Sequence, residues 1–224
     1  NVVDQRTAFT YASALTTKGG APMARVNVHP DGWRAPGDRE AFLADADAQV
    51  LSGNPLSLLA LADLDVDLHP LVVFSGAAHL APGARRRLEQ RWGAPVIDVY
   101  GTREAGLVAA DRTGDRGTDG QTRHTVLPRR VHAEILDEHG EQVPDGERGD
   151  VVVTVDDNPY LPLLRYRTGD TAALVRERDA EGTWATVLVG LEGRAAVRFQ
   201  TADGRWVPSV DTTQLLQAYG LAAW

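Results

Sequence analysis

The segment between residues 38 and 99 alternates strand-like apolar runs with stretches of helical pattern. The runs cover residues 48–51, 71–74 and 96–99, and the helical stretches cover residues 38–45, 56–62 and 82–92. Continuous apolar strands are typical of a parallel sheet that is covered on both faces. Pro82 suits the first turn of its helix, and Gly93 suits its end. Strand, helix and strand at this short spacing predict parallel pairing.

The first 35 residues have weaker patterns. Residues 9–15 fit either a helix or a strand. Residues 18–22 predict a turn, residues 24–28 alternate like a short strand, and residues 29–32 predict a second turn. The segment 24–28 is the strand that we expect in this region.

Beyond Gly106 the helical pattern stops. Residues 111–120 are rich in Asp, Gly and Thr and predict a loop. Strands are expected within residues 131–155 and at 163–166, 171–175 and 184–189, with turns at 138–140 and 144–146. The order of these patterns predicts an α/β fold, in which a parallel-sheet α/β subdomain (residues 1–127) precedes a smaller β-rich subdomain (residues 128–194).

Three of the expected strands are followed by loops of small residues, at 52–54, 75–77 and 100–102. Because the carboxyl ends of parallel strands share one edge of a sheet, these loops should lie together at the edge where open α/β sheets bind ligands. A glycine in each loop lets the backbone approach a flat or phosphorylated ligand closely. We therefore expect a ligand site at this edge.

Composition narrows the classes of function. The net charge of −8 argues against nucleic-acid binding, which needs a basic surface, whereas one nucleotide needs only local donors. The absence of cysteine excludes disulfides and thiolate zinc sites and fits a cytoplasmic protein. No run of about 18 apolar residues and no signal peptide is found, so we expect no membrane insertion. Lys18 is the only lysine.

The segment Tyr100-Gly101-Thr102-Arg103-Glu104 combines groups that suit a nucleotide. A tyrosine ring can stack on a base, and hydroxyl and guanidinium groups can hold a phosphate. The Glu104 carboxylate can bind Mg²⁺. Taken alone, the segment also fits an ordinary loop after a strand, with an exposed tyrosine.

Two further segments contain groups that suit a ribose. Asp170 follows Thr168 and Gly169, and an acidic residue there can accept hydrogen bonds from two vicinal hydroxyls. Taken alone, Thr-Gly-Asp is also typical of a hairpin turn. Arg194 follows Gly193 and can reach a ribose or phosphate oxygen, or lie on the surface.

Together and in this order, these segments resemble the adenylate-forming (AMP-binding) enzymes, and within them the phenylacetate–CoA ligase and coenzyme F390 synthetase-like group. The matching segments are 75–78, 100–104, 132–137, 149–154, 162–170 and 193–194. The resemblance covers residues 48–216 and is most specific at 162–170. It implies part of the N-terminal domain of such an enzyme, with residues 195–224 forming the junction and the start of a truncated C-terminal domain.

The resemblance also implies roles for single residues. It places adenine against Ser75, Gly76, Ala77, Ala78, Asp98, Val99, Tyr100 and Gly101, with the Tyr100 ring stacked on the base. It implies that Asp170 binds the ribose hydroxyls and that Arg194 supports them. Either Thr102 or Arg103 contacts the α-phosphate, and Glu104 holds Mg²⁺.

The family reaction joins a carboxylate to ATP, which gives acyl-AMP and pyrophosphate, and then usually passes the acyl group to CoA. The resemblance therefore implies ATP or AMP, Mg²⁺ and CoA as ligands and a small aryl or acyl carboxylic acid as substrate. Two alternatives stay open. One is a non-catalytic, degenerate adenylation fold that serves as a binding module, and the other is a stand-alone enzyme that loads a carrier protein.

Several positions depart from the family pattern. Arg103 stands where the family has Ser or Thr, and Ala195 and Ala196 follow the Gly-Arg junction where acidic hinge residues are usual. Residues 16–22 resemble the phosphate loop in composition but lie too close to the later motifs, and the catalytic lysine of the C-terminal domain has no counterpart. We therefore expect the adenosine half of the site without the pyrophosphate loop and the lid.

Overall fold

The computed structural model describes residues 1–5, 8, 10–13, 23–111, 121–178, 182–194, 198–202, 204 and 206–208. Outside these residues lie the turn expected at 18–22, all but the first residue of the loop expected at 111–120, and Ala195 and Ala196. The elements up to residue 102 are β1 (Val2–Val3), β2 (Tyr11–Ser13), β3 (Met23–Asn27), the short 3-10 helix η1 (Pro30–Gly32), α1 (Asp38–Ala46), β4 (Val50–Gly53), α2 (Pro55–Ala62), β5 (Val72–Gly76), α3 (Pro82–Trp92) and β6 (Val96–Thr102).

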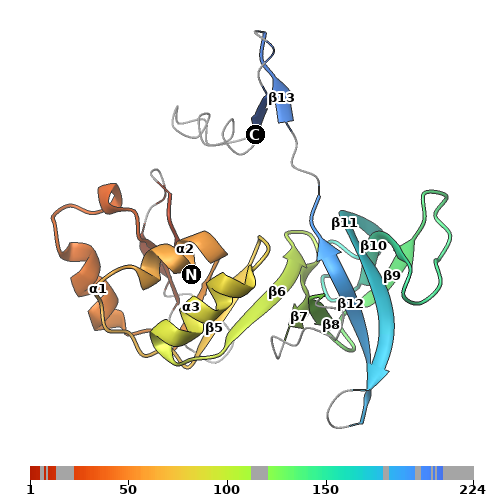
Figure 1. The fold of residues 1–224 in the computed structure, drawn as a ribbon, viewed down its shortest axis with the longest axis horizontal. Coiled ribbons are helices and arrows are strands. Elements are labelled where there is room, and N and C mark those ends of the chain that lie inside the picture. Colours follow the sequence, from red (N-terminus) through yellow and green to blue (C-terminus); the bar gives the residue numbers. More distant parts are fainter. Residues whose placement is uncertain are drawn as a thin grey trace.

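The elements after residue 102 are strands in the described part of the chain. They are β7 (Gly106–Asp111), β8 (Arg123–Val126), β9 (His132–Leu136), β10 (Arg148–Val155), β11 (Leu163–Arg178), β12 (Trp184–Glu192), β13 (Arg198–Gln200) and β14 (Trp206–Pro208). Among the described residues, 12 strands form one mixed sheet in the order β2-β3-β1-β4-β5-β6-β7-β8-β12-β11-β10-β9. Figure 1 shows the helices gathered around the first strands of this sheet, and β6 leading from them into the β-rich part.

The first half of the sheet is parallel where the strand–helix–strand pattern predicts it. β4 pairs with β5 and β5 with β6, both in parallel. α2 begins at Pro55 because the Asn54 side chain accepts a hydrogen bond from the Ser57 N–H at 2.9 Å and proline suits the first helical turn. α3 ends at Gly93, which adopts the left-handed conformation that a helix end favours.

A first hydrophobic core joins α2 and α3 to this half of the sheet. Leu58 and Leu61 of α2 and Leu88 of α3 are almost fully buried and belong to the same cluster as Val73 of β5. Burial of such side chains contributes about 1.5–3 kcal/mol each, so the apolar faces of the helices hold them on the sheet. The carboxyl ends of β4, β5 and β6 are thereby fixed side by side.

A second core fills the β-rich half. It includes Tyr100 of β6, Val108 of β7, Val151 and Val153 of β10, and Leu188 of β12. β7 pairs antiparallel with β6 and β8, and it packs in this second core. The chain therefore passes from the first core to the second within β6, before residue 127, where the α/β subdomain was expected to end. The predicted order, a parallel α/β part followed by a β-rich part, is confirmed.

Several residues expected outside strands lie within them: residues 52–53 end β4, and residues 75–76 end β5. Residues 100–102 continue β6 instead of forming a loop, because β7 turns back at once and pairs with them. Residues 168–170 do not form a hairpin turn but lie inside the 16-residue strand β11. Asp150 of β10 pairs with Thr171, and Val152 pairs with Arg167. Between these two pairs, β10 has one residue, Val151, whereas β11 has three, so the segment is a bulge.

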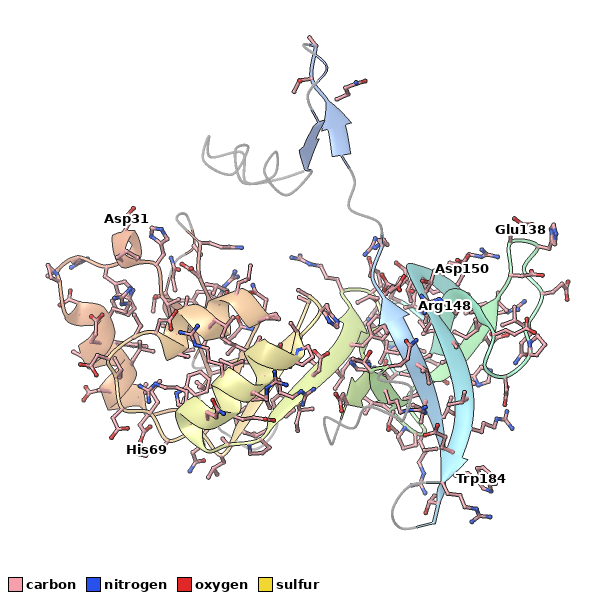
Figure 2. All side chains as sticks on the ribbon, in the orientation of Figure 1. Asp31, His69, Glu138, Arg148, Asp150 and Trp184 are labelled. Carbon is pink, nitrogen blue, oxygen red and sulfur yellow. The ribbon has the colours of Figure 1, made fainter. Side chains whose placement is uncertain are left out.

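Charged pairs cover exposed positions of the β-rich half. Arg148 and Asp150, labelled in Figure 2, pair with Glu192 at 3.2 Å and with Arg167 at 2.6 Å. Trp184, at the outer end of β12 in Figure 2, lies under the Arg178 guanidinium at 4.7 Å. These contacts link β10, β11 and β12 at the surface of the sheet, where such exposed pairs contribute little to stability. In the described part of the chain, no helix is long and apolar enough to cross a bilayer.

Candidate functional site

A pocket of about 430 Å³ lies where the two halves of the sheet meet. It is lined by residues 77–79 after β5, residues 98–103 of β6 and the following turn, Thr122 and His124 at β8, Asp170 of the β11 bulge, and Leu191, Gly193 and Arg194 at the end of β12. The volume is within the range of small-ligand sites. Two of the three expected loops, at 75–77 and 100–102, thus reach a cavity, whereas residues 52–54 are not among its lining residues. Residues far apart in the sequence share this cavity.

Asp170 is held on one wall of the pocket by three residues. The Tyr100 hydroxyl donates a hydrogen bond to Asp170 Oδ2 at 2.8 Å, and the Arg194 backbone N–H donates to Oδ1 at 3.0 Å. The Asp170 N–H donates to Thr168 Oγ1 at 3.2 Å. With 8% of its surface exposed, Asp170 is almost buried yet reaches the cavity. Its carboxylate is therefore oriented before any ligand arrives.

The bulge that carries Asp170 needs glycine at position 169. Gly169 has a φ of +82°, which L side chains rarely adopt, and a Cβ there would lie 2.8 Å from Arg194 Cδ. The Thr168 hydroxyl donates to the Val151 carbonyl at 3.0 Å and anchors the bulge on β10. The segment therefore has a conformation that positions both Asp170 and Arg194.

Tyr100 lies at the centre of the wall formed by β6. Burial raises the pKa of its hydroxyl well above the usual value, and the hydrogen bond to Asp170 raises it further. The hydroxyl therefore stays protonated near neutral pH and acts as the donor to Asp170. The residue is 9% exposed, and it both lines the pocket and belongs to the second core.

The loop after β5 contributes only part of the expected set. Ala77, with a φ of +63°, and Ala78 line the pocket. Ser75 is fully buried in β5, and no lining atom of the pocket comes from Ser75 or Gly76. Gly76 packs so closely on β6 that a Cβ would lie 2.8 Å from Val99 Cγ2. These two residues set the spacing of the strands beneath the loop.

The turn from β6 to β7 forms another edge of the pocket. Thr102 and Arg103 line it, whereas Glu104 is exposed next to it and is not among the lining residues. Hydrogen bonds from its own backbone N–H and from the Thr102 hydroxyl hold the pKa of Glu104 below its usual value. In the described part of the chain, no three His, Cys, Asp or Glu side chains gather as a metal site, so the Mg²⁺ role of Glu104 stays a prediction.

His124 is a lining residue that sequence reasoning missed. Its Nε2 lies 3.3 Å from Asp98 Oδ2, and both side chains are more than nine-tenths buried. Alternation along β8, where His124 and Val126 are buried and Arg123 and Thr125 are not, was the available signal that His124 points inward.

Comparison with known proteins identifies the fold. Residues 16–156 match the family of the AMP-binding enzyme, which is more than half of the chain. The chain belongs to the AMP-binding enzyme family. The family match ends before Asp170 and Arg194, so the expected roles of these two residues depend on the pocket that they line.

Two curated relatives are phenylacetate-coenzyme A ligases. That of Pseudomonas putida is 30% identical over 142 residues, which cover 60% of the chain and 32% of the relative. That of Escherichia coli (strain K12) is 31% identical over 101 residues, covering 45% of the chain and 22% of the relative. The resemblance to the phenylacetate–CoA ligase group is therefore confirmed, and the chain spans about a third of the length of the first relative.

Solved structures give the same fold. A 2-hydroxyisobutyryl-CoA ligase in complex with R3-HIB-AMP has a TM-score of 0.60 and 22% identity, covering 85% of the chain and 42% of the ligase. An amide bond synthetase from Marinactinospora thermotolerans has a TM-score of 0.51 and 24% identity, covering 79% of the chain and 37% of the synthetase. At these identities the likeness shows the fold alone.

Proposed function

We propose that this chain forms the adenosine-binding half of an active site that activates a carboxylic acid as acyl-AMP. The observation that supports this best is the pre-oriented Asp170, held by Tyr100 and Arg194 on the wall of a pocket that Ala77 also lines. A carboxylate with both oxygens oriented suits the two vicinal hydroxyls of a ribose. The family to which the chain belongs supports the same ligand.

In this proposal, different residues of the pocket contact the base, the ribose and the phosphate of the nucleotide. The Tyr100 ring stacks on adenine, Ala77 and Ala78 lie along the base, and Asp170 binds the ribose. Thr102 or Arg103 contacts the α-phosphate, since both line the cavity and offer a hydroxyl or a guanidinium group. Arg194 lies next to Asp170 and supports the ribose or the phosphate.

Mg²⁺ fits this arrangement only together with a nucleotide. Mg²⁺ is usually bound through one or two carboxylates, phosphate oxygens and water, and Glu104 offers one ionised carboxylate beside the pocket. Bound there, the ion would neutralise phosphate charge. Glu104 would hold it, and its lowered pKa keeps the carboxylate charged near neutral pH.

The proposed reaction is a nucleotidyl transfer to the acid. A carboxylate oxygen forms a bond to the α-phosphorus of ATP, and the bond to pyrophosphate breaks, with pyrophosphate leaving as the anion. The residues of this chain would contribute positioning of the α-phosphate and neutralisation of its charge. CoA is the proposed second acceptor because the curated relatives are named as coenzyme A ligases.

The acid, a small aryl or acyl carboxylic acid, and a cytoplasmic location are parts of this proposal. A carrier protein as acceptor is the second candidate for the same chemistry. A non-catalytic binding module is the alternative from a different class, and Arg103 in place of the usual hydroxyl residue favours it.

Calorimetry with AMP, ATP and an acyl-sulfamoyl-adenosine tests the binding part, and binding of all three is the expected result. No heat with any of them would contradict the adenosine site. Release of pyrophosphate by the full-length protein with a panel of carboxylic acids separates enzyme from binding module. Nucleotide binding without pyrophosphate release for any acid would favour the non-catalytic module.

A further inference from the structure

Arg130 lies in the turn between β8 and β9, and its guanidinium binds two segments that are distant from it in the sequence. Nη1 donates to the Leu107 carbonyl, and Nη2 donates to the Ala105 carbonyl at 2.8 Å. Nε lies 2.8 Å from Asp157 Oδ2, in the segment between β10 and β11. All three guanidinium nitrogens are therefore engaged, although Arg130 is not among the residues that line the pocket.

The two carbonyls that Arg130 binds lie on either side of Gly106, the first residue of β7. Gly106 has a φ of +66°, and a Cβ there would lie 2.9 Å from Arg130 Nη2. Gly106 also pairs with Thr102 across the hairpin of β6 and β7. Because the guanidinium is a rigid planar fork, its two hydrogen bonds fix the carbonyls relative to each other. Arg130 thus fixes the start of β7, where the chain leaves the turn.

Further hydrogen bonds extend this constraint into the turn itself. The Ala105 N–H donates to Thr102 Oγ1 at 3.0 Å, and Ala105 is 2% exposed. The Thr102 hydroxyl is also hydrogen-bonded to the Glu104 carboxylate. Thr102 and Arg103 line the pocket, and Glu104 is exposed next to it. The residues proposed for the phosphate and for Mg²⁺ are therefore connected to Arg130 through Ala105.

This constraint matters because the turn is at the surface. Arg103 and Glu104 are exposed, so burial does not fix their positions. A group that is already held in its binding position loses less conformational entropy when a ligand arrives, which raises the affinity. The base and the ribose are assigned to Tyr100 and Asp170, which lie within β6 and β11. A less ordered turn should therefore weaken contacts with a phosphate and leave those with adenosine intact.

We propose that Arg130 is a positioning residue for the phosphate end of the site, and that it orders the turn of Thr102, Arg103 and Glu104 without touching the ligand. The inference rests on the proposed nucleotide site. Asp157 binds the third guanidinium nitrogen and so helps to orient the fork toward the two carbonyls. The affinity for a nucleotide should accordingly depend on Arg130 only through the phosphate.

Calorimetry on the full-length protein compares adenosine with AMP, which differ only in the phosphate. In Arg130→Met the affinity for AMP should fall about tenfold, while the affinity for adenosine should stay within about twofold. An equal loss for both ligands would show a general effect on the fold and overturn the positioning role, as would an unchanged affinity for AMP. Failure of the unmodified protein to bind either ligand would instead contradict the proposed function itself.

Two further variants separate positioning from charge. Arg129→Met removes the same charge at the exposed neighbouring position and should leave the affinity for AMP within about twofold. Arg130→Lys keeps the charge but replaces the fork by a single ammonium group, so the affinity for AMP relative to adenosine should fall about threefold.

A loss in Arg129→Met as large as in Arg130→Met, or an unchanged ratio of the two affinities in Arg130→Lys, would mean that only charge acts, and it would overturn the proposal. Thermal unfolding monitors the fold of each variant. If Arg130→Met does not fold, the ratio of the affinities for AMP and adenosine in Arg130→Lys decides.

Discussion

Asp170 owes its orientation to neighbours from two other segments, because the Tyr100 hydroxyl and the Arg194 N–H each occupy one carboxylate oxygen. A tyrosine at this position thus has two separable functions. In the proposed site its ring would stack on a base, while its hydroxyl positions Asp170, the proposed ribose ligand.

Tyr100→Phe separates these functions, since it keeps the ring and removes the donor. We expect the affinity for AMP to fall about tenfold, which corresponds to one hydrogen bond to a charged group. Calorimetry with AMP and with 2′,3′-dideoxy-AMP provides the measurement. The dideoxy nucleotide lacks the ribose hydroxyls and should bind the variant and the unmodified protein alike, so an equal loss for both nucleotides would contradict the positioning role.

Gly169 offers a second test at this scale because a matched glycine exists elsewhere. Gly169→Ala and Gly146→Ala both place a side chain at a φ above +80°, and each should lower the free energy of unfolding by about 1–2 kcal/mol. Only in Gly169→Ala would the added Cβ contact Arg194, because a Cβ at position 146 would have no atom within 4 Å. AMP binding should therefore weaken in Gly169→Ala alone, and equal affinities in the two variants would refute the contact.

At the scale of elements, local sequence explains where the helices begin and end. α3 spans Pro82–Trp92, the range that the pattern predicts, because proline begins it and Gly93 ends it. β7 was not anticipated. Residues 106–111 follow the motif directly and show no turn signal, and they become a strand because β6 and β8 supply partners on both sides.

The start of α2 can be tested through its cap. Asn54→Ala removes the acceptor for the Ser57 N–H and should lower the free energy of unfolding by about 1 kcal/mol. Asn54→Asp keeps a cap oxygen and serves as the control, with a change of a few tenths of a kcal/mol expected. Urea denaturation measures both. A loss of the same size in the two variants would show that the cap is not what stabilises this helix.

At the scale of the whole molecule, one buried ion pair connects the two cores. Arg85 of α3 donates to Asp111 of β7 at 2.6 Å, and the two side chains are 15% and 5% exposed. The helix packs in the first core and the strand in the second, so the pair links the two halves of the sheet.

Arg85→Met should therefore lower the free energy of unfolding by about 2–4 kcal/mol, because it removes a charged partner from a buried carboxylate. Arg86→Met, at the exposed neighbouring position of the same helix, removes the same charge and should change it by less than about 0.5 kcal/mol. Urea unfolding curves followed by circular dichroism compare the two. Similar midpoints would contradict a role for the Arg85–Asp111 pair in holding the halves together.

The sequence by itself determined the order of the elements from α1 to β6, the parallel pairing of β4, β5 and β6, and the family, because apolar periodicity, proline and glycine signals and short motifs are local. Tertiary structure decided the rest. Asp170 becomes a pocket residue only because a bulge in β11 brings it to Tyr100, which lies 70 positions earlier in the sequence. His124 acquires its environment from Asp98 across the sheet. Partners of this kind come from strands that are distant in sequence, and no local pattern encodes them.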